Sequence, residues 1–305
     1  MKHTESTNHE KKALSRRQFI MSTALSIPIL SGCASLAKPS PRPYRILQDW
    51  HMHTNRAGGK PDMNVRDMIL TNEAYGLKLM GISEHIDRLD QREDFKEKIR
   101  LNRTEAEAVK LSTNMKIMIG TETTMINPKL CSLGAELATM LDYRLVSCNH
   151  YHLKHVENAT SPTAEKYAGH YLEMLHGAID LGFTDTIGHP FYHQKLHKKY
   201  GPELLHATLK AYDQDDFTAM LKRAAQVNMA FEINPRHADL ALDWFKDLVQ
   251  EARLHGTKFT VGTDAHAIKS LGYPEGDAGR TCQDVLRDLT ITDGDLKWKP
   301  IIFSG

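Results

Sequence analysis

From residue 45 onward, this sequence alternates short apolar runs with longer segments of helical periodicity, and that alternation restricts the fold more than any other feature. The apolar runs predict buried strands at residues 45–48, 77–82, 115–119, 143–147, 183–187, 229–233 and 258–261. Predicted helices between them include residues 65–75, 93–112, 165–181 and 240–255. A regular alternation of strand and helix predicts an α/β fold with a parallel sheet, either open or closed.

Each predicted strand ends in, or is followed by, a side chain of a type that binds metal ions. Along the chain these are His51 and His53, His85, Glu122, His150, His189, Glu232, and Asp264 with His266. From His53 to Asp264, successive positions lie 28 to 43 residues apart, which is about one strand and one helix. In a closed parallel barrel the C-terminal strand ends meet on one rim, whereas an open sheet spreads them along a line. We therefore predict a distorted (β/α)7 barrel with a metal site at the C-terminal rim of its strands.

Histidine is the outlier of the composition, with 17 copies among 305 residues, and it is the commonest side-chain ligand of transition metals. His51 and His53 are two residues apart, so on a strand they point to the same face. Such a spacing often arises by chance in a histidine-rich protein. Asp264 and His266 repeat it after the last predicted strand, which neighbours the first strand in a closed barrel. The two pairs together therefore favour a shared metal site.

Seven short motifs follow one another along the chain. They are His51-Met52-His53, Ser83-Glu84-His85, Gly120-Thr121-Glu122, Asn149-His150-Tyr151, Gly188-His189-Pro190, Glu232-Ile233-Asn234 and Thr263-Asp264-Ala265-His266. Each motif is weak alone, but the ordered set resembles the PHP (polymerase and histidinol phosphatase) family of metal-dependent phosphoesterases over residues 45–270. The resemblance implies a (β/α)7 barrel with two or three divalent metal ions, and it gives the Glu232 stretch a place in the pocket without a firm metal role.

The resemblance also implies a set of metal ligands. They are His51, His53, His85, Glu122, His150, His189, Asp264 and His266. The HxH pair and Asp264 would hold one ion, and Glu122 would bridge it to a second ion completed by His150 and His189. A third ion would be held by His85 and His266. Catalysis would depend on Glu122, Asp264 and His266.

One ligand of the family pattern is missing from this sequence. Relatives with three metals have another histidine a few residues beyond the HxH pair, and residues 54–62 contain none. Asp62 or a water could replace it, and we expect two tightly held ions and one weak ion. Nitrogen and oxygen ligands without thiolate suit Zn, Mn or Fe. The four cysteines have no CxxC spacing, so the sequence indicates neither a zinc knuckle nor a disulfide scaffold.

A pair of divalent ions can activate a water for attack on phosphorus, so the resemblance predicts a hydrolase of small phosphorylated substrates, with phosphomonoesters favoured. Phosphate also needs positive partners, and the nearest to the predicted rim are Arg56, Arg88 and Arg236. Each could equally form an ordinary surface salt bridge. We favour Arg236 because it follows Glu232-Ile233-Asn234 by two residues. The basic stretch at residues 193–199 is either a solvated surface loop or a second attraction for anions.

Two other functions remain open. Amidohydrolase-type enzymes, which cleave amides or lactones, also begin with HxH on a barrel strand, but they usually bridge their metals with a strand-end lysine. None of the strand ends here supplies a lysine, and Glu122 takes the bridging position. A metal-binding lipoprotein without catalysis is the second alternative. Residues 34–305 have a net charge of −2, which gives no electrostatic case for nucleic acid as a partner.

The N-terminus predicts export. Arg16-Arg17 precedes an apolar stretch at residues 19–30, which is too short to span a membrane, and this arrangement resembles a twin-arginine signal. Leu30-Ser31-Gly32-Cys33 then resembles a lipobox whose cysteine becomes lipidated. The predicted organisation is a signal at 1–33, a linker at 34–44 and a catalytic domain at 45–305. We expect export by the twin-arginine machinery and a lipid anchor in the periplasm or cell envelope, with simple cleavage after Ala37 as the alternative.

Overall fold

The computed structural model describes residues 46–192, 201–273 and 280–298. The predicted signal and linker, with Arg16, Arg17 and Cys33, lie outside these residues, and so does the whole basic stretch at 193–199. Among the described helices, none is both long enough and apolar enough to cross a membrane.

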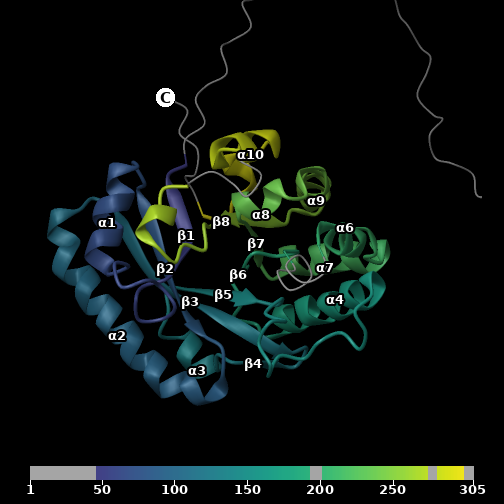
Figure 1. The fold of residues 1–305 in the computed structure, drawn as a ribbon, viewed down its shortest axis with the longest axis horizontal. Helices are drawn as coiled ribbons and strands as arrows, with labels where there is room; N and C mark the ends of the chain where they lie inside the picture. Colours follow the sequence, from purple (N-terminus) through teal and green to yellow (C-terminus); the bar gives the residue numbers. More distant parts are fainter. Residues whose placement is uncertain (1–45, 193–200, 274–279, 299–305) are drawn as a thin grey trace, which may run out of the picture. The chain divides into compact units, whose positions relative to one another are not determined.

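Seven parallel strands form one sheet in the order of the sequence (Figure 1). They are β1 (Gln48–Met52), β2 (Leu79–Ile86), β3 (Lys116–Asn127), β5 (Tyr143–Ser147), β6 (Thr186–Ile187), β7 (Ala230–Ile233) and β8 (Lys258–Val261). A two-residue strand, β4 (Leu130–Cys131), pairs antiparallel with the end of β3. Beyond β8 the chain returns to β1, where His53 N–H donates to Ala265 O at 3.0 Å. The sheet is thus a nearly closed barrel, which confirms the predicted fold class.

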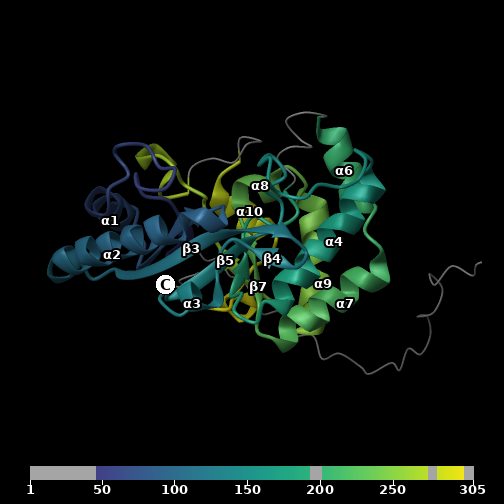
Figure 2. The same cartoon turned by 90° about the horizontal axis from the view of Figure 1, so that it is seen from below.

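Helices cover the outside of this barrel (Figures 1 and 2). The longer ones are α1 (Val65–Ala74), α2 (Arg92–Val109), α4 (Ala164–Asp180), α6 (Pro202–Lys210), α7 (Gln214–Gln226) and α9 (Leu242–His255). The shorter ones are α3 (Ala135–Ala138), α8 (Pro235–Asp239) and α10 (Cys282–Asp288), with 3-10 turns at Leu89–Gln91, Lys110–Ser112, Ile268–Ser270 and Asp293–Asp295. In both views α1 and α2 lie on one side of the strands, and α4, α6, α7 and α9 lie on the other.

The strand bounds differ from the prediction at the rim. The first predicted strand ended at residue 48 and the second at 82, but β1 continues through His51 and β2 continues through His85. Glu122 likewise lies inside β3 rather than after it. The apolar run stops early because the inner face of each strand becomes polar near the rim, while the ladder of backbone hydrogen bonds continues. The predicted helix 240–255 is confirmed as α9, which begins two residues later, whereas α3, α6, α7, α8 and α10 were not among the predicted helices.

Aromatic side chains fill the lower part of the barrel. The Tyr143 and Trp50 rings meet edge to face with centroids 5.1 Å apart, and Tyr143 O–H donates to Trp50 O at 2.8 Å. Trp298 packs on Trp50 from the end of the described chain, at a centroid distance of 3.9 Å. Gly81 and Gly120 make room for Tyr143, because a methyl group at either position would overlap its side chain. This aromatic layer closes the lower part of the barrel.

A register shift in β1 turns its histidines inward. Asp49 pairs with Met80 and Met52 pairs with Ile82, so three steps along β1 match two along β2. This bulge lets Trp50 and His51, although adjacent in sequence, both face the barrel interior. The Asp49 carboxylate supports the bulge by accepting His51 N–H at 3.0 Å and Thr263 N–H at 3.1 Å, which also ties β1 to the segment after β8. Burial raises the pKa of this carboxyl group to about 7.

Candidate metal centre

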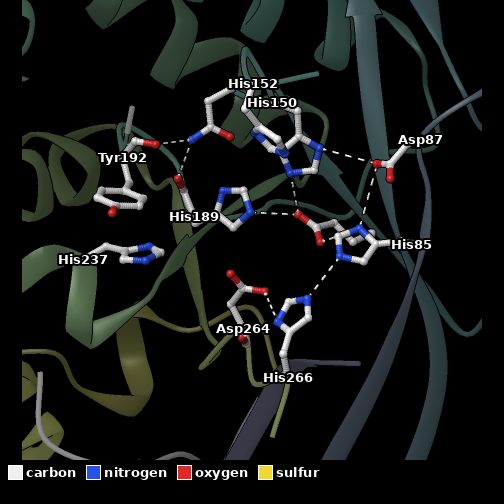
Figure 3. A pocket seen from close by; sticks show the side chains of 11 residues that line it. His85, Asp87, His150, His152, His189, Tyr192, His237, Asp264 and His266 are labelled. Atoms are coloured by element: carbon white, nitrogen blue, oxygen red, sulfur yellow. Dashed lines mark hydrogen bonds and ion pairs between the residues drawn. The ribbon is translucent and has the colours of Figure 1, made fainter. Parts of the chain in front are cut away.

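Histidine and carboxylate side chains converge at the C-terminal rim in three overlapping groups. Figure 3 shows those that also line the adjoining cavity, among them His150, His189 and Asp264. Among the described residues, the potential ligand atoms within each group all lie within 4.8 Å of one another. The groups are His51, His53, Glu122 and Asp264; Glu122, His150 and His189; and His53, His85 and His266. All eight ligands implied by the sequence motifs therefore lie in one cluster, although their binding of metal stays a prediction.

Glu122 stands at the centre, and each of its two oxygens faces a different group. Oε2 lies 3.2 Å from His51 Nε2 and 3.4 Å from His53 Nε2. Oε1 lies 2.8 Å from His189 Nε2 and 3.1 Å from His150 Nε2. The side chain is fully buried, at the inner face of β3. This is the arrangement that a carboxylate bridging two ions requires.

The two carboxylates of the cluster remain ionised. Burial alone would raise the pKa of Glu122, but His85, His51 and His150 outweigh it and hold that pKa well below the usual range. The pKa of Asp264 is also lowered, because the nearby His51 and His53 outweigh its burial. Asp264 Oδ1 lies 3.1 Å from His53 Nε2. Its backbone is left-handed, with φ of 55°, and this turn aims the carboxylate into the barrel.

The third group is built from three rings. His53 stacks on His85 and on His266 with centroid distances of 4.2 Å in both cases, and Nε2 of His85 lies 3.3 Å from Nε2 of His266. Nδ1–H of His266 donates to Asp264 O at 3.0 Å, which leaves Nε2 for a ligand bond. Gly58 lies against the rings, since a Cβ atom there would sit 3.2 Å from His85 Cδ2.

Asp62, a candidate to replace the missing ligand, is exposed and belongs to none of the three groups. The neighbouring Lys60 N–H instead donates to His266 O at 2.8 Å, so this loop supports the third group through its backbone. The structure therefore gives the third group three imidazoles and no carboxylate of its own.

The chemistry of the donors fits divalent cations. Nε2 of His51 and Oε2 of Glu122 are buried, face each other and have no hydrogen-bond partner among the described residues. His51 Nδ1–H donates to Glu232, so in the neutral imidazole that binds a metal ion Nε2 carries the lone pair, and an ionised carboxylate also offers only lone pairs. A cation must lie between these two atoms, either a proton on Nε2 in the metal-free protein or a bound metal ion. Nitrogen and oxygen donors of this kind suit Zn, Mn or Fe.

Glu232 belongs to none of the three ligand groups, but it positions two of the predicted ligands. Its oxygens lie 2.9 and 3.1 Å from His51 Nδ1, and one of them also accepts the backbone N–H of His189. One carboxylate thus fixes a histidine of the first group and the backbone of a histidine of the second. Carboxylates that hold metal-binding histidines set both the ring orientation and the basicity of the ligand.

A cavity of about 250 Å³ opens beside the cluster (Figure 3). Its wall includes five residues that sequence reasoning did not place there: Asp87, Asn149, His152, Tyr192 and His237. Tyr192 and His237 stack with centroids 3.7 Å apart at an angle of 15°. Asn149 Nδ2 donates to both His189 O and Tyr192 O, so it links the stacked Tyr192 and His237 rings to the backbone of a predicted ligand. Burial and the nearby His189 lower the pKa of His237 well below its usual value.

The three arginines chosen as phosphate contacts do not line this cavity. The Arg56 guanidinium donates to Asn102 at 2.9 Å and pairs with Glu105. Arg88 pairs with Asp90 at 2.9 Å on the surface. Arg236, at the start of α8, precedes the cavity residue His237 and lies outside the wall itself. Among the described residues, the cavity wall contains neither lysine nor arginine, and contact of these three arginines with a substrate stays a prediction.

Comparison with known proteins supports the fold. No protein-family model matches the chain, and no curated protein matches it in sequence. The crystal structure of a histidinol phosphate phosphatase from Lactococcus lactis, complexed with Zn, L-histidinol and phosphate, is similar, with 18% identity, a TM-score of 0.51 and coverage of 79% of this chain and 91% of that one. A putative histidinol phosphatase from Listeria monocytogenes is 15% identical, with a TM-score of 0.50 and coverage of 74% and 97%. These likenesses show that the chain shares their fold.

Proposed function

We propose that this protein is a metal-dependent hydrolase of phosphoesters, with small phosphomonoesters as its substrates. The observation that carries the proposal is the position of Glu122, whose two oxygens face two separate groups of histidines. A pair of divalent ions held there would activate a water and neutralise charge on a phosphate group.

The chain's own residues supply binding and orientation. Glu122 and Asp264 are held ionised and offer negative oxygens to both ends of the centre. Glu232 fixes the ring of His51, and the Asp264 carbonyl fixes the ring of His266. Because the described cavity wall has no lysine or arginine, the charge of a bound phosphate would be balanced mainly by the bound ions. On this proposal Glu122, Asp264 and His266 are the catalytic residues.

Two further observations favour phosphoesters. The structure shares its fold with two histidinol phosphatases, one of them solved with Zn, L-histidinol and phosphate. The bridging position is a glutamate, whereas the amidohydrolase alternative usually bridges its metals with a lysine, and no lysine lines the described cavity. A non-catalytic metal-binding protein would not need an open cavity of about 250 Å³ beside its ligands.

We also propose that the protein acts outside the cytoplasm. The sequence at Arg16-Arg17 and the lipobox ending in Cys33 support twin-arginine export and a lipid anchor in the periplasm or envelope. Histidinol phosphate is a biosynthetic intermediate of the cytoplasm, so an exported enzyme would act on a different small phosphoester.

The test of the hydrolase proposal is an assay of the full chain, loaded in parallel with Zn, Mn or Fe(II), against p-nitrophenyl phosphate, bis-p-nitrophenyl phosphate and a lactone. We expect hydrolysis of the monoester that disappears on treatment with a chelator and in Glu122→Gln. Glu107→Gln, on the exposed face of α2, is the matched control and should keep full activity. Lactone hydrolysis without phosphoester hydrolysis would instead support the amidohydrolase alternative.

A further inference from the structure

We propose that Thr124 and Asp87 are positioning residues, which hold the imidazole of His150 through a hydrogen-bond relay in the orientation that metal binding requires. The inference rests on the proposed metal centre, and it assigns work to two side chains that belong to none of the three ligand groups.

Three neighbouring strands bring the relay together. Asp87 directly follows β2, Thr124 lies on β3 two residues beyond Glu122 and on the same face, and His150 follows β5. Thr124 Oγ1 lies 2.7 Å from His150 Nδ1 and 2.7 Å from Asp87 Oδ1. The direct distance from Asp87 Oδ1 to His150 Nδ1 is 3.6 Å, which is too long for a good hydrogen bond (Figure 3). The hydroxyl of Thr124 is therefore the link between the carboxylate and the imidazole.

The chemistry of the Asp87, Thr124 and His150 side chains fixes the direction of the hydrogen bonds in the relay. An ionised carboxylate can only accept, so the single O–H of Thr124 donates to Asp87. The oxygen of Thr124 then has only lone pairs left for His150, and Nδ1–H of His150 must donate to it. In the neutral imidazole that binds a metal ion, Nε2 of His150 then carries the lone pair, and this atom faces the centre at 3.1 Å from Glu122 Oε1. The relay thus selects the tautomer and the ring orientation that a ligand needs.

His51 shows the same principle in a simpler form. Glu232 accepts Nδ1–H of His51 directly, at 2.9 Å. Each of the two groups that share Glu122 therefore has one histidine anchored by a carboxylate from a different strand, directly for His51 and through Thr124 for His150. Such outer carboxylates make a ligand more basic and restrict its rotation, and their loss typically weakens metal binding by about 10- to 100-fold.

The experiment measures metal affinity in the full chain, stripped with chelator and titrated with Zn against a chromophoric competitor. We expect Thr124→Val and Asp87→Ala each to weaken one of the two tight ions by about 10- to 100-fold, and Thr124→Ser to restore binding to near the native value. Thr121→Val is the matched control, because Thr121 is buried on the same strand and donates to Glu84 O at 3.0 Å without touching a ligand. Native affinity for both ions in Thr124→Val would overturn the proposal.

A second readout reports the relay itself. In protein labelled with ¹⁵N-histidine and loaded with Zn, we expect His150 to show a protonated Nδ1 and a metal-bound Nε2, and its Nδ1 proton to exchange much faster in Thr124→Val. A His150 that binds through Nδ1 would also overturn the proposal. Neither readout uses turnover. A protein that binds two ions, one of them through His150, but hydrolyses no phosphoester would therefore contradict the proposed function and leave the relay proposal standing.

Discussion

Glu232 accepts Nδ1–H of His51 at 2.9 Å and, with the same carboxylate, the backbone N–H of His189. Glu232 lies on β7, whereas the two histidines come from β1 and from the segment after β6. One buried side chain therefore links two of the ligand groups from outside both of them. This gives Glu232 a defined structural role, where the sequence motif alone indicated only that it lines the pocket.

We predict that Glu232→Gln weakens the ion held by His51, His53 and Asp264. A neutral amide would orient His51 less strongly and make its Nε2 less basic, so the affinity should fall by about 10- to 100-fold. Competitive Zn titration measures this loss. Glu107→Gln, which changes the same chemical group on the exposed face of α2, should bind like the native protein. Equal affinities in the two variants would show that Glu232 does not position the ligand.

A second prediction concerns the packed layer below the centre. Gly120→Ala should destabilise the protein by about 1–3 kcal/mol or more, because its methyl group would overlap the Tyr143 ring inside the barrel. The control is Gly169→Ala in α4, where the added methyl group meets nothing within 4 Å. Alanine favours a helix over glycine, so this control should stabilise by about 0.5–1 kcal/mol. Thermal unfolding of metal-free protein measures both, and equal shifts in the two variants would contradict the packing argument.

A third prediction tests export. In a bacterial host with twin-arginine export, replacing Arg16 and Arg17 with lysine should leave the precursor in the cytoplasm. Cys33→Ala should release the processed domain from the membrane fraction, because the lipid attachment point is gone. Cell fractionation with immunoblotting measures both effects. A processed Cys33→Ala protein that stays in the membrane fraction would argue against lipidation.

The residues at the rim of the barrel were predictable from sequence because the C-terminal ends of all parallel strands meet on the same rim. Side chains as distant as His51 and Asp264 meet because each lies at the C-terminal end of a strand, and a polar residue after an apolar run is easy to recognise. Asp87 was missed because it lies just beyond β2, outside any regular element, and His237 because α8 is only five residues long, so in neither case does periodicity indicate which way the side chain points. Arg56 follows His53 by three residues, but its loop turns it away toward Glu105.

The last prediction is that activity depends more steeply on Glu122 than on His85. Glu122 faces two ligand groups and carries a negative charge that offsets the repulsion between two cations, so Glu122→Gln should lose metal from both and nearly all turnover.

His85 belongs to the third group, which contains three imidazoles and no carboxylate of its own. His85→Ala should keep two ions and mainly raise KM, provided that the third ion contacts the substrate equally in the ground and transition states. Elemental analysis and steady-state kinetics on the two variants separate these roles. If His85→Ala abolished turnover while Glu122→Gln kept both ions and a near-native kcat, the bridging role of Glu122 would be wrong, because a carboxylate that holds two cations together cannot lose its charge without effect.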